Sequence, residues 1–357
     1  MRILFVVRSI GYGGASKQLA LTANAMAEMG HTVCIYSYNW NELGQELYSS
    51  VKYVPEANVV STSIWEYFLS PFRIRKQIKR FHPEIIVSWR ANAGCMTVLA
   101  NIGLSPKTVF SERTDPYMET NWMLKIATKI ADISDGGVFQ TDGARVFYKR
   151  LAKKSVVIPN FTPIVPLQAI IPFEERVKEI VCVSRLFVKQ KRQDILLEAF
   201  KIVHERHPEY SLKLYGDGDG LVFLKHLAEN LGIGDCVKFM GAVNHITEHI
   251  KSAKVLALSS DYEGIPNVLL EAMSVGVPVV TTDTSPGGAR LIVKNGLNGF
   301  VVPIGDSEKL ADKIIFLIEN IETANLFIEN GFKRLDDFSN EAIAYSWENY
   351  LEKIAVK

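Results

Sequence analysis

Short apolar runs alternate with amphipathic stretches along the whole chain, which is the pattern of an α/β protein. In the first half, four runs rich in β-branched residues predict buried parallel strands at residues 3–7, 33–36, 85–88 and 108–110. Apolar residues at helical spacing predict connecting helices at residues 17–29 and 72–81. We therefore expect a parallel sheet covered by helices.

The second half repeats this rhythm. Apolar runs predict strands at residues 179–183, 212–215, 237–240, 255–258 and 278–282, and helical spacing predicts helices at residues 195–203 and 340–354. Between the halves, a short run at 156–158 leads into a segment with four prolines, Pro159, Pro163, Pro166 and Pro172. Because 357 residues exceed the usual size of one domain and prolines punctuate linkers, we predict two domains joined here.

Residues 259–280 are the stretch around which the second half is organised. A loop with Glu263, Gly264 and Pro266 follows the apolar run, Asn267 is expected to cap the next helix, and Glu271 lies one turn into it. The positive end of a helix attracts phosphate, and a neighbouring carboxylate can accept hydrogen bonds from sugar hydroxyls. This pattern favours a nucleotide sugar as ligand. The alternative is an ordinary strand–loop–helix corner with two solvated glutamates.

Net charge is +1, so the composition does not indicate a nucleic-acid partner. The two halves differ, however: up to Ile170 there are 19 Lys and Arg against 12 Asp and Glu, and after it 21 against 27. A basic first half could face an anionic partner, and an ordinary uneven surface explains the asymmetry equally well.

The four cysteines are scattered without a Cys-x-x-Cys pair, and Cys34 and Cys182 lie within apolar runs. We interpret them as reduced core thiols of a cytoplasmic protein rather than as a disulfide framework or zinc site. The amino terminus runs directly into the first predicted strand, so we expect no signal peptide. No apolar run is long enough for a spanning helix.

Glycines follow the first predicted strand, where Gly13 and Gly14 would let backbone N–H groups approach a ligand closely. This loop does not match Gly-x-Gly-x-x-Gly, and no acidic residue ends the second strand, which argues against a nicotinamide-dependent dehydrogenase.

A second set of polar residues follows the strand at 179–183. Arg185 lies at the strand end and Lys191 near the next helix start, so both cations can neutralise a diphosphate in place of a metal; Lys189 is a rival to Lys191. The pair Asp217 and Asp219 lacks the final glutamate of a calcium loop.

The motif Glu-Gly-x-Pro…Glu-Ala-Met…Gly-x-Pro-Val-Val, at residues 263–280, resembles the donor-site signature of retaining glycosyltransferases of family 4. The Gly-Gly-Ala loop at 13–15, the Ile-Pro-Asn segment at 158–160, the Arg-Leu…Lys element at 185–191, the Gly-Asp-Gly turn at 216–218 and an Asn-Gly-x-x-Val hairpin near 298–302 are similar to other family elements.

The resemblance implies a GT-B fold, in which two Rossmann-like domains face a central cleft. The domains would span residues 1–168 and 169–338, with a C-terminal helix at 339–357 crossing back to the first. The implied activity is metal-independent transfer of a hexose or N-acetylhexosamine, with retention, from a nucleoside diphosphate sugar, UDP in our reading, and no cofactor. The acceptor would be a saccharide or lipid-linked saccharide of cell-surface glycan synthesis. A GT-B sugar-nucleotide epimerase and a non-catalytic nucleotide-sugar-binding protein are the alternatives.

By this resemblance, three residues would have catalytic roles: Glu263, Arg185 and Lys191. The donor would contact Gly13, Gly14, Gly216, Val243, Gly264, Ile265, Pro266, Asn267 and Glu271. The usual acceptor-side histidine is replaced by Glu112 and Arg113, as in members that build surface polysaccharides; together with Arg90 they become acceptor-side candidates, with a structural salt bridge as the alternative. The basic helix at 72–81 either packs on the sheet through Ile74, Ile78 and Phe81 or contacts the inner face of the membrane.

Overall fold

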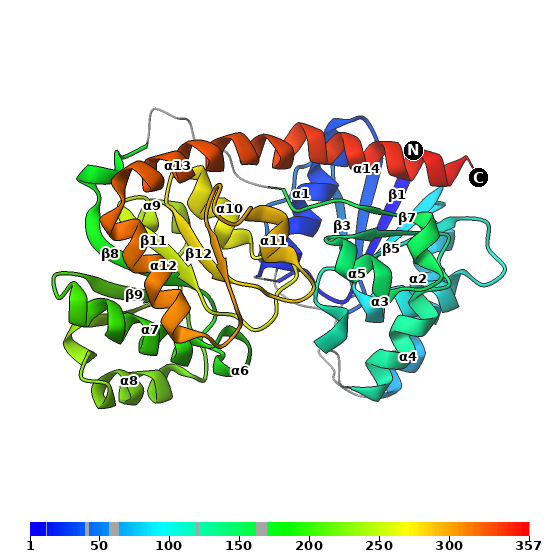
Figure 1. Ribbon diagram of the computed structural model, residues 1–357. Helices are drawn as coiled ribbons and strands as arrows, with labels where there is room; N and C mark the ends of the chain where they lie inside the picture. Colours follow the sequence, from blue (N-terminus) through cyan, green and yellow to red (C-terminus); the bar gives the residue numbers. More distant parts are fainter. Residues whose placement is uncertain (12, 40–42, 57–63, 119–120, 162–169, 357) are drawn as a thin grey trace. The chain divides into compact units, whose positions relative to one another are not determined.

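The computed structural model describes residues 1–356 except 12, 40–42, 57–63, 119–120 and 162–169. The chain divides into two compact units (Figure 1). The first comprises Met1–Phe161 together with Asn340–Lys357, and the second comprises Thr162–Ser339. The last helix is thus part of the first unit.

In the first unit, seven described strands form one parallel sheet in the order β3-β2-β1-β4-β5-β6-β7. The strands are β1 (Arg2–Val7), β2 (Thr32–Ser37), β3 (Lys52–Pro55), β4 (Ile85–Trp89), β5 (Lys107–Ser111), β6 (Gly136–Phe139) and β7 (Ser155–Val157). The helices are α1 (Gly14–Glu28), α2 (Ile64–Phe81), α3 (Ala91–Asn101), α4 (Trp122–Ala131), α5 (Asp142–Phe147) and α14 (Asn340–Ala355).

Alternating residues of β1 separate the two faces of this sheet. Ile3 and Phe5 pack with α1 and α14, whereas Leu4 and Val6 pack with α2 and α3. Both faces are therefore buried, which explains why the strands are nearly continuous apolar runs instead of alternating ones.

Helix α14 is anchored in the core of the first unit by two aromatic residues. Trp347 is fully buried and stacks on Trp89 of β4 with ring centroids 6.0 Å apart. The Tyr350 hydroxyl accepts a hydrogen bond from the backbone N–H of Gly137 at 2.7 Å. Helix α14 therefore completes the hydrophobic core that β1 and α1 form at the start of the first unit.

In the second unit, six described strands form a parallel sheet in the order β10-β9-β8-β11-β12-β13. The strands are β8 (Val177–Val183), β9 (Ser211–Tyr215), β10 (Val237–Gly241), β11 (Ala253–Leu258), β12 (Val279–Thr282) and β13 (Phe300–Val302). The helices are α6 (Val188–Lys191), α7 (Gln193–Arg206), α8 (Leu221–Asn230), α9 (Ile246–Ile250), α10 (Asn267–Ser274), α11 (Gly288–Ile292), α12 (Ser307–Glu319) and α13 (Ile321–Leu335).

Two local expectations were wrong. Asn267 is the first residue of α10 and Pro266 occupies the cap position, so the helix begins one residue earlier than the capping preference indicates. The segment near 298–302 does not form a hairpin, since β13 pairs in parallel with β12. The sequence pattern also missed β3 and β6; β6 begins with two glycines, which lack the apolar signal of a strand.

The basic helix at 72–81 is the carboxyl-terminal half of α2. Its stripe of Ile74, Ile78 and Phe81 is buried against the sheet, which confirms the packing interpretation for these residues. None of the described helices has the length and apolar content that spanning a bilayer requires.

Replacing Trp347 by alanine is expected to lower the free energy of unfolding by about 3–5 kcal/mol, because a large cavity would open between α14 and β4. The matched control is Tyr345→Ala on the same helix, where the side chain is exposed and the change should stay within about 0.5 kcal/mol. Urea unfolding followed by far-ultraviolet circular dichroism measures both. Equal midpoints for the two variants would contradict the anchoring role of Trp347.

Candidate functional site

The strand order of the second unit reverses between β8 and β11. From β8 the chain builds outwards through β9 to β10, and then returns to the other side of β8 with β11. Loops that follow two such strands diverge, and open α/β sheets generally bind ligands in the crevice at this point, outside the carboxyl ends of the strands. The connection after β8 carries Arg185 in its loop and Lys191 at the end of the short helix α6, and the loop after β11 carries Glu263.

These two loops are hydrogen-bonded to each other. The backbone N–H of Asp261 donates to the carbonyl of Gln190 at 2.9 Å. The Gln190 amide donates to the carbonyl of Tyr262 at 3.1 Å, and the Ser259 hydroxyl donates to the carbonyl of Lys191 at 2.9 Å. Segments about 70 positions apart are therefore held together by these hydrogen bonds.

Lys191 and Glu263 meet at the centre of this junction. The Lys191 ammonium group donates to Glu263 Oε1, and the two side chains are only 13% and 12% exposed. The Ser260 hydroxyl donates to the same carboxylate oxygen at 2.8 Å. By contrast, Lys189 is exposed and forms no ion pair with a described residue. Of the two rival lysines, Lys191 is the one that contacts the predicted donor glutamate.

Arg185 is exposed at the end of β8, and its side chain has no ion-pair partner among the described residues. Its backbone is fixed by Gln193, a fully buried residue whose amide donates to the carbonyl of Arg185 at 2.8 Å and to the Ser184 hydroxyl at 2.9 Å. Arg192 is differently engaged, because it pairs with Asp194 at 3.1 Å and Asp261 at 3.3 Å. Arg185 is thus a positioned cation that remains accessible to a ligand.

Two glycines are required by close backbone contacts around the crevice. A Cβ at Gly216 would lie 2.0 Å from the carbonyl oxygen of Ser184, and Gly216 has φ +133°. A Cβ at Gly288 would lie 1.7 Å from the carbonyl oxygen of Gly264. Side chains at either position would push the neighbouring segments apart, so these glycines set the spacing between the loops.

Helix α10 supplies the anion-attracting end that the sequence predicted. No side chain caps its amino terminus and no acidic residue lies in its first turn, so its own sequence does not neutralise the positive end of the dipole. Ile265 and Pro266 are buried, which fixes the entry of the chain into the helix. Glu271 is the fifth helical residue and is half-buried.

Val243 lies beyond β10, on the outer side of β9. Gly216 and Gly241 bridge the ends of β9 and β10, and Asp217 accepts a hydrogen bond from the backbone N–H of Ala242 at 3.1 Å. The turn that carries Val243 is therefore tied to the turn after β9, next to the crevice.

The remaining predicted residues belong to the first unit. Gly13 has φ +134°, caps α1 and is exposed, as is Gly14. Arg90 is exposed after β4 with φ +74°, a conformation that few residues other than glycine adopt. Glu112 and Arg113 directly follow β5 and are both buried.

Glu112 and Arg113 make extensive contacts inside the first unit. Glu112 accepts hydrogen bonds from the hydroxyls of Thr114 at 2.9 Å and Tyr148 at 2.6 Å. The Arg113 guanidinium lies 4.5 Å from the Trp89 ring and 5.3 Å from that of Trp347. Burial lowers the pKa of Arg113, and the Glu112 charge opposes that shift. Their structural role is clear, and an acceptor role for them stays a prediction.

Sequence reasoning missed Ser260, Gln190 and Gln193, which position the charged residues. Their one local signal is a polar residue next to a functional one, and only the fold shows which polar neighbour points inwards. In the described parts of the chain, no group of three or more His, Cys, Asp and Glu side chains is arranged to hold a metal ion.

Two family models match the chain, one for each unit. Residues 12–164 match the model described as Glycosyltransferase Family 4, and residues 167–334 match the model described as Glycosyl transferases group 1. Together they cover nearly all of the chain.

Among the relatives of this chain, an uncharacterized glycosyltransferase of Haemophilus influenzae is 24% identical over 98% of this chain and 99% of its own. An α-1,4-N-acetyl-D-galactosaminyltransferase of Campylobacter jejuni, named for an undecaprenol-diphosphate-linked acceptor, is 23% identical over 99% of both chains.

The fold matches solved structures over its whole length. The structure of Anabaena Alr3699/HepE in complex with UDP-glucose aligns with a TM-score of 0.79 and 19% identity, covering 99% of this chain and 100% of that one. The two parallel sheets described above are those of the GT-B fold. The matched models and the fold lead to one conclusion: the chain belongs to the family 4 and group 1 glycosyltransferases and is a GT-B glycosyltransferase.

Proposed function

We propose that the protein moves a hexose or N-acetylhexosamine from UDP to a hydroxyl of a saccharide or lipid-linked saccharide, with retention and without a metal ion. The observation that carries this proposal is the contact between Lys191 and Glu263 at the point where the strand order reverses. Held together at this point, the cation would bind the diphosphate of a sugar donor and the carboxylate would accept hydrogen bonds from its sugar hydroxyls.

The contact suggests how donor binding would reorganise the site. A diphosphate carries more negative charge than one carboxylate, so it would compete with Glu263 for the Lys191 ammonium group. Glu263 would then be free to accept hydrogen bonds from sugar hydroxyls, while Ser260 keeps its carboxylate oriented. Arg185, which is accessible, would move onto the same diphosphate. Lys191 and Arg185 would stabilise the leaving group as its charge develops.

The other proposed contacts with the donor follow from where the residues lie around the site. Backbone groups of 264–267 at the uncapped end of α10 would contact the diphosphate, and Glu271 further along the helix would hold the ribose diol. Gly216 and the backbone of Val243 would border the nucleobase. Gly13 and Gly14 would let the first loop approach the phosphates.

The proposal contains no enzymic nucleophile. In the same-face displacement that the family resemblance implies, the leaving phosphate removes the proton from the attacking hydroxyl, and the protein supplies positioning and charge neutralisation. The UDP-glucose complex of HepE supports UDP as the carrier, and the Campylobacter relative supports a lipid-linked acceptor in bacterial glycan synthesis. Arg90 is our accessible candidate for the acceptor side, with Glu112 and Arg113 supporting it.

We also propose that the protein works in the cytoplasm, on the inner face of the membrane. None of its four cysteines forms a disulfide and three are buried, which is typical of a reducing compartment. Exposed Leu69 and Phe72 on α2 lie among exposed Lys76 and Lys79. Such a combination favours an anionic lipid surface.

Replacing Lys191 by methionine is expected to lower kcat/KM by roughly 10²–10³, as for removal of one donor from a charge-stabilising site. Lys189→Met removes the same charge two residues away and should change kcat/KM less than about twofold. Turnover of UDP-sugar donors, followed by release of UDP, measures both variants.

Loss of Lys191 also leaves Glu263 without its cation, which could destabilise the loops. The double variant Lys191→Met with Glu263→Gln removes that unpaired charge and should restore the melting temperature without restoring activity. Near-normal turnover in Lys191→Met, or equal losses in both lysine variants, would contradict the assignment.

The stereochemistry and metal requirement are tested together. A screen of UDP-sugars by thermal shift selects the donor, and the anomeric configuration of the product, read by proton NMR, should equal that of the donor. Activity should persist in excess EDTA. An inverted product, or activity lost in EDTA and restored by a divalent cation, would overturn the corresponding part of the proposal.

A further inference from the structure

A pocket of about 400 Å³ lies at the amino ends of the strands in the first sheet, whereas the predicted acceptor residues follow the carboxyl ends. Lys107 is the first residue of β5 and Ser155 the first of β7, so the pocket is at the amino ends of the strands. Glu112 and Arg113 follow the carboxyl end of β5. Because a five-residue strand spans roughly 16 Å, the pocket is separate from that edge.

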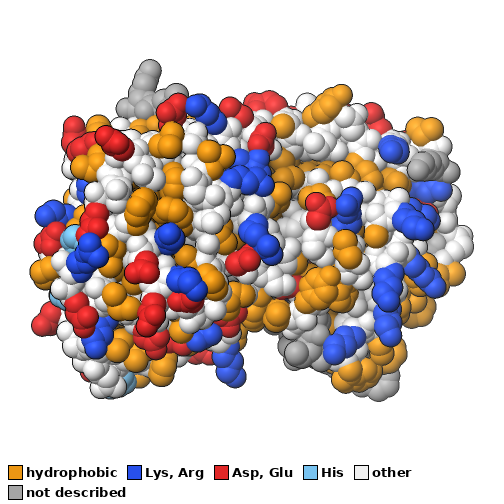
Figure 2. Space-filling view, in the orientation of Figure 1, with side chains coloured by type: hydrophobic (Ala, Val, Ile, Leu, Met, Phe, Trp, Pro, Cys, Tyr) orange, Lys and Arg blue, Asp and Glu red, His pale blue; other side chains and the backbone are white. Residues whose placement is uncertain are grey.

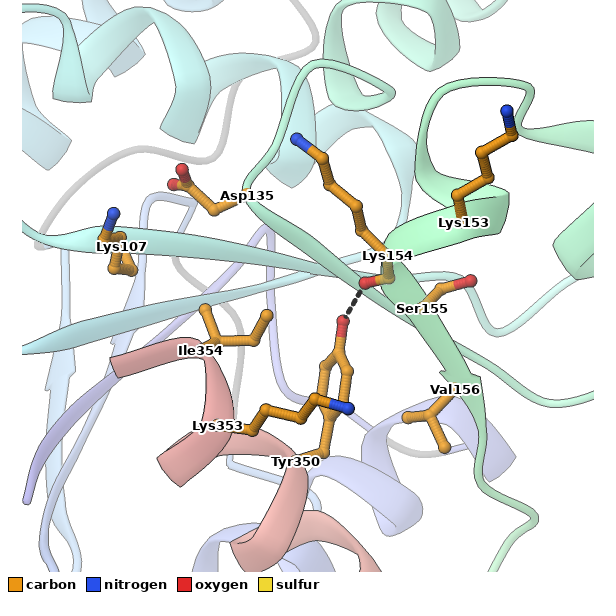
Figure 3. A pocket seen from close by; sticks show the side chains of 9 residues that line it. All are labelled: Lys107, Asp135, Lys153, Lys154, Ser155, Val156, Tyr350, Lys353 and Ile354. Atoms are coloured by element: carbon orange, nitrogen blue, oxygen red, sulfur yellow. Dashed lines mark hydrogen bonds between the residues drawn. The ribbon is translucent and has the colours of Figure 1, made fainter. Parts of the chain in front are cut away.

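The lining of this pocket is strongly basic. Four lysines contribute to it, Lys107, Lys153, Lys154 and Lys353, and Asp135 is the one acidic residue in the lining. Figure 3 shows the lysines coming from three places in the fold: the start of β5, the turn before β7, and helix α14.

None of the four lysines forms an ion pair with a described residue, whereas Lys213 and Lys309 elsewhere in the chain are paired with carboxylates. Asp135 offsets the cluster only partly, because its Oδ2 atom accepts hydrogen bonds from the backbone N–H and the hydroxyl of Thr108, at 2.8 and 3.0 Å. Lys153, Lys154 and Lys353 are exposed and Lys107 is partly buried, so their ammonium groups remain available to an anion.

The cationic walls are built on a rigid floor. The Tyr350 hydroxyl accepts from the Gly137 N–H and donates to the carbonyl of Lys154, which ties the turn before β7 to α14. Burial raises the pKa of Tyr350 to about 12, so this hydroxyl stays protonated and continues to donate at physiological pH. Lys353 lies one turn further along α14, and buried Ile354 closes the floor beside it.

The surroundings also favour an anion. On the face drawn in Figure 2, Lys and Arg side chains predominate over the first unit, while acidic and basic side chains are intermixed over the second. This agrees with the excess of Lys and Arg in the first half of the sequence.

We propose that this pocket binds a phosphate-bearing anion with at least two negative charges, at a site separate from the donor crevice. The four ammonium groups supply charge and hydrogen-bond donors, and the apolar floor excludes water from one side of the bound group. The same chemistry is offered by a free oligophosphate and by an anionic lipid headgroup at the membrane, and experiment distinguishes these two sources.

The first arm uses inorganic pyrophosphate in isothermal titration with the full chain, in saturating UDP so that the donor crevice is occupied. Lys107→Gln combined with Lys353→Gln is expected to weaken pyrophosphate binding by roughly tenfold or more, and added salt should weaken wild-type binding. Lys153→Gln with Lys154→Gln removes the same charge from the turn before β7 and should weaken pyrophosphate binding by a similar factor. Far-ultraviolet circular dichroism confirms that each variant is folded.

The second arm measures sedimentation with vesicles of phosphatidylglycerol and phosphatidylcholine against pure phosphatidylcholine. Two lysines near an anionic surface contribute about 1 kcal/mol each, so a headgroup site predicts a loss of roughly tenfold or more in the pocket variants. The matched control is Lys125→Gln with Lys129→Gln, which removes two exposed charges from α4 in the same unit, away from the pocket lining and from α2.

A loss in the pocket variants and not in the control supports the site, and the arm in which it occurs identifies the source of the anion. If the pocket variants behave as wild type in both arms, or no more weakly than the control, the proposal is overturned. Because neither arm measures sugar transfer, failure here is distinct from failure of the proposed activity.

Discussion

The reversal of strand order between β8 and β11 is the constraint on which the candidate site depends. It brings the loop after β8 against the loop after β11, and backbone hydrogen bonds then fix the distance between them. Lys191 and Glu263 meet because of that geometry, although they are far apart in sequence. The largely buried pair keeps a cation and a carboxylate in one place at low reorganisation cost, which is what a site for a charged sugar donor requires.

The close contacts at Gly216 and Gly288 show how tightly this arrangement is specified. Both glycines face a backbone carbonyl oxygen and not a flexible side chain, so the neighbouring loop has no easy way to yield. Ser260, Gln190 and Gln193 add directional hydrogen bonds to the same loops. The charged residues are therefore held by a shell that contributes no charge itself, and such a shell is what gives a site its precision.

The first unit uses its charged residues in two different ways. At the carboxyl ends of its strands, Glu112 and Arg113 are buried among aromatic rings and hydroxyls and stabilise the fold around α14. At the amino ends of the strands, four lysines line one pocket and form no ion pair with a carboxylate of a described residue. Glu112 and Arg113 are buried and held by contacts inside the fold, whereas Lys153, Lys154 and Lys353 are exposed and Lys107 is only partly buried. The contrast separates residues with a structural role from lysines that remain accessible to a ligand.

The sequence by itself determined the class of the fold, most of its strands and the location of the donor motif. Buried parallel strands are short apolar runs, and this signal is local, so it can be read without knowing what packs against it. The family resemblance predicted Glu263 and Glu271 as site residues from one segment and Arg185 and Lys191 from another.

Only the tertiary structure decided that Lys191 and not Lys189 contacts Glu263, that Glu112 and Arg113 are buried, and that lysines from β5, the turn before β7 and α14 share one pocket. These facts depend on strand order and on the return of α14 to the first core. Such contacts join residues tens to hundreds of positions apart, and no periodicity along the chain encodes them.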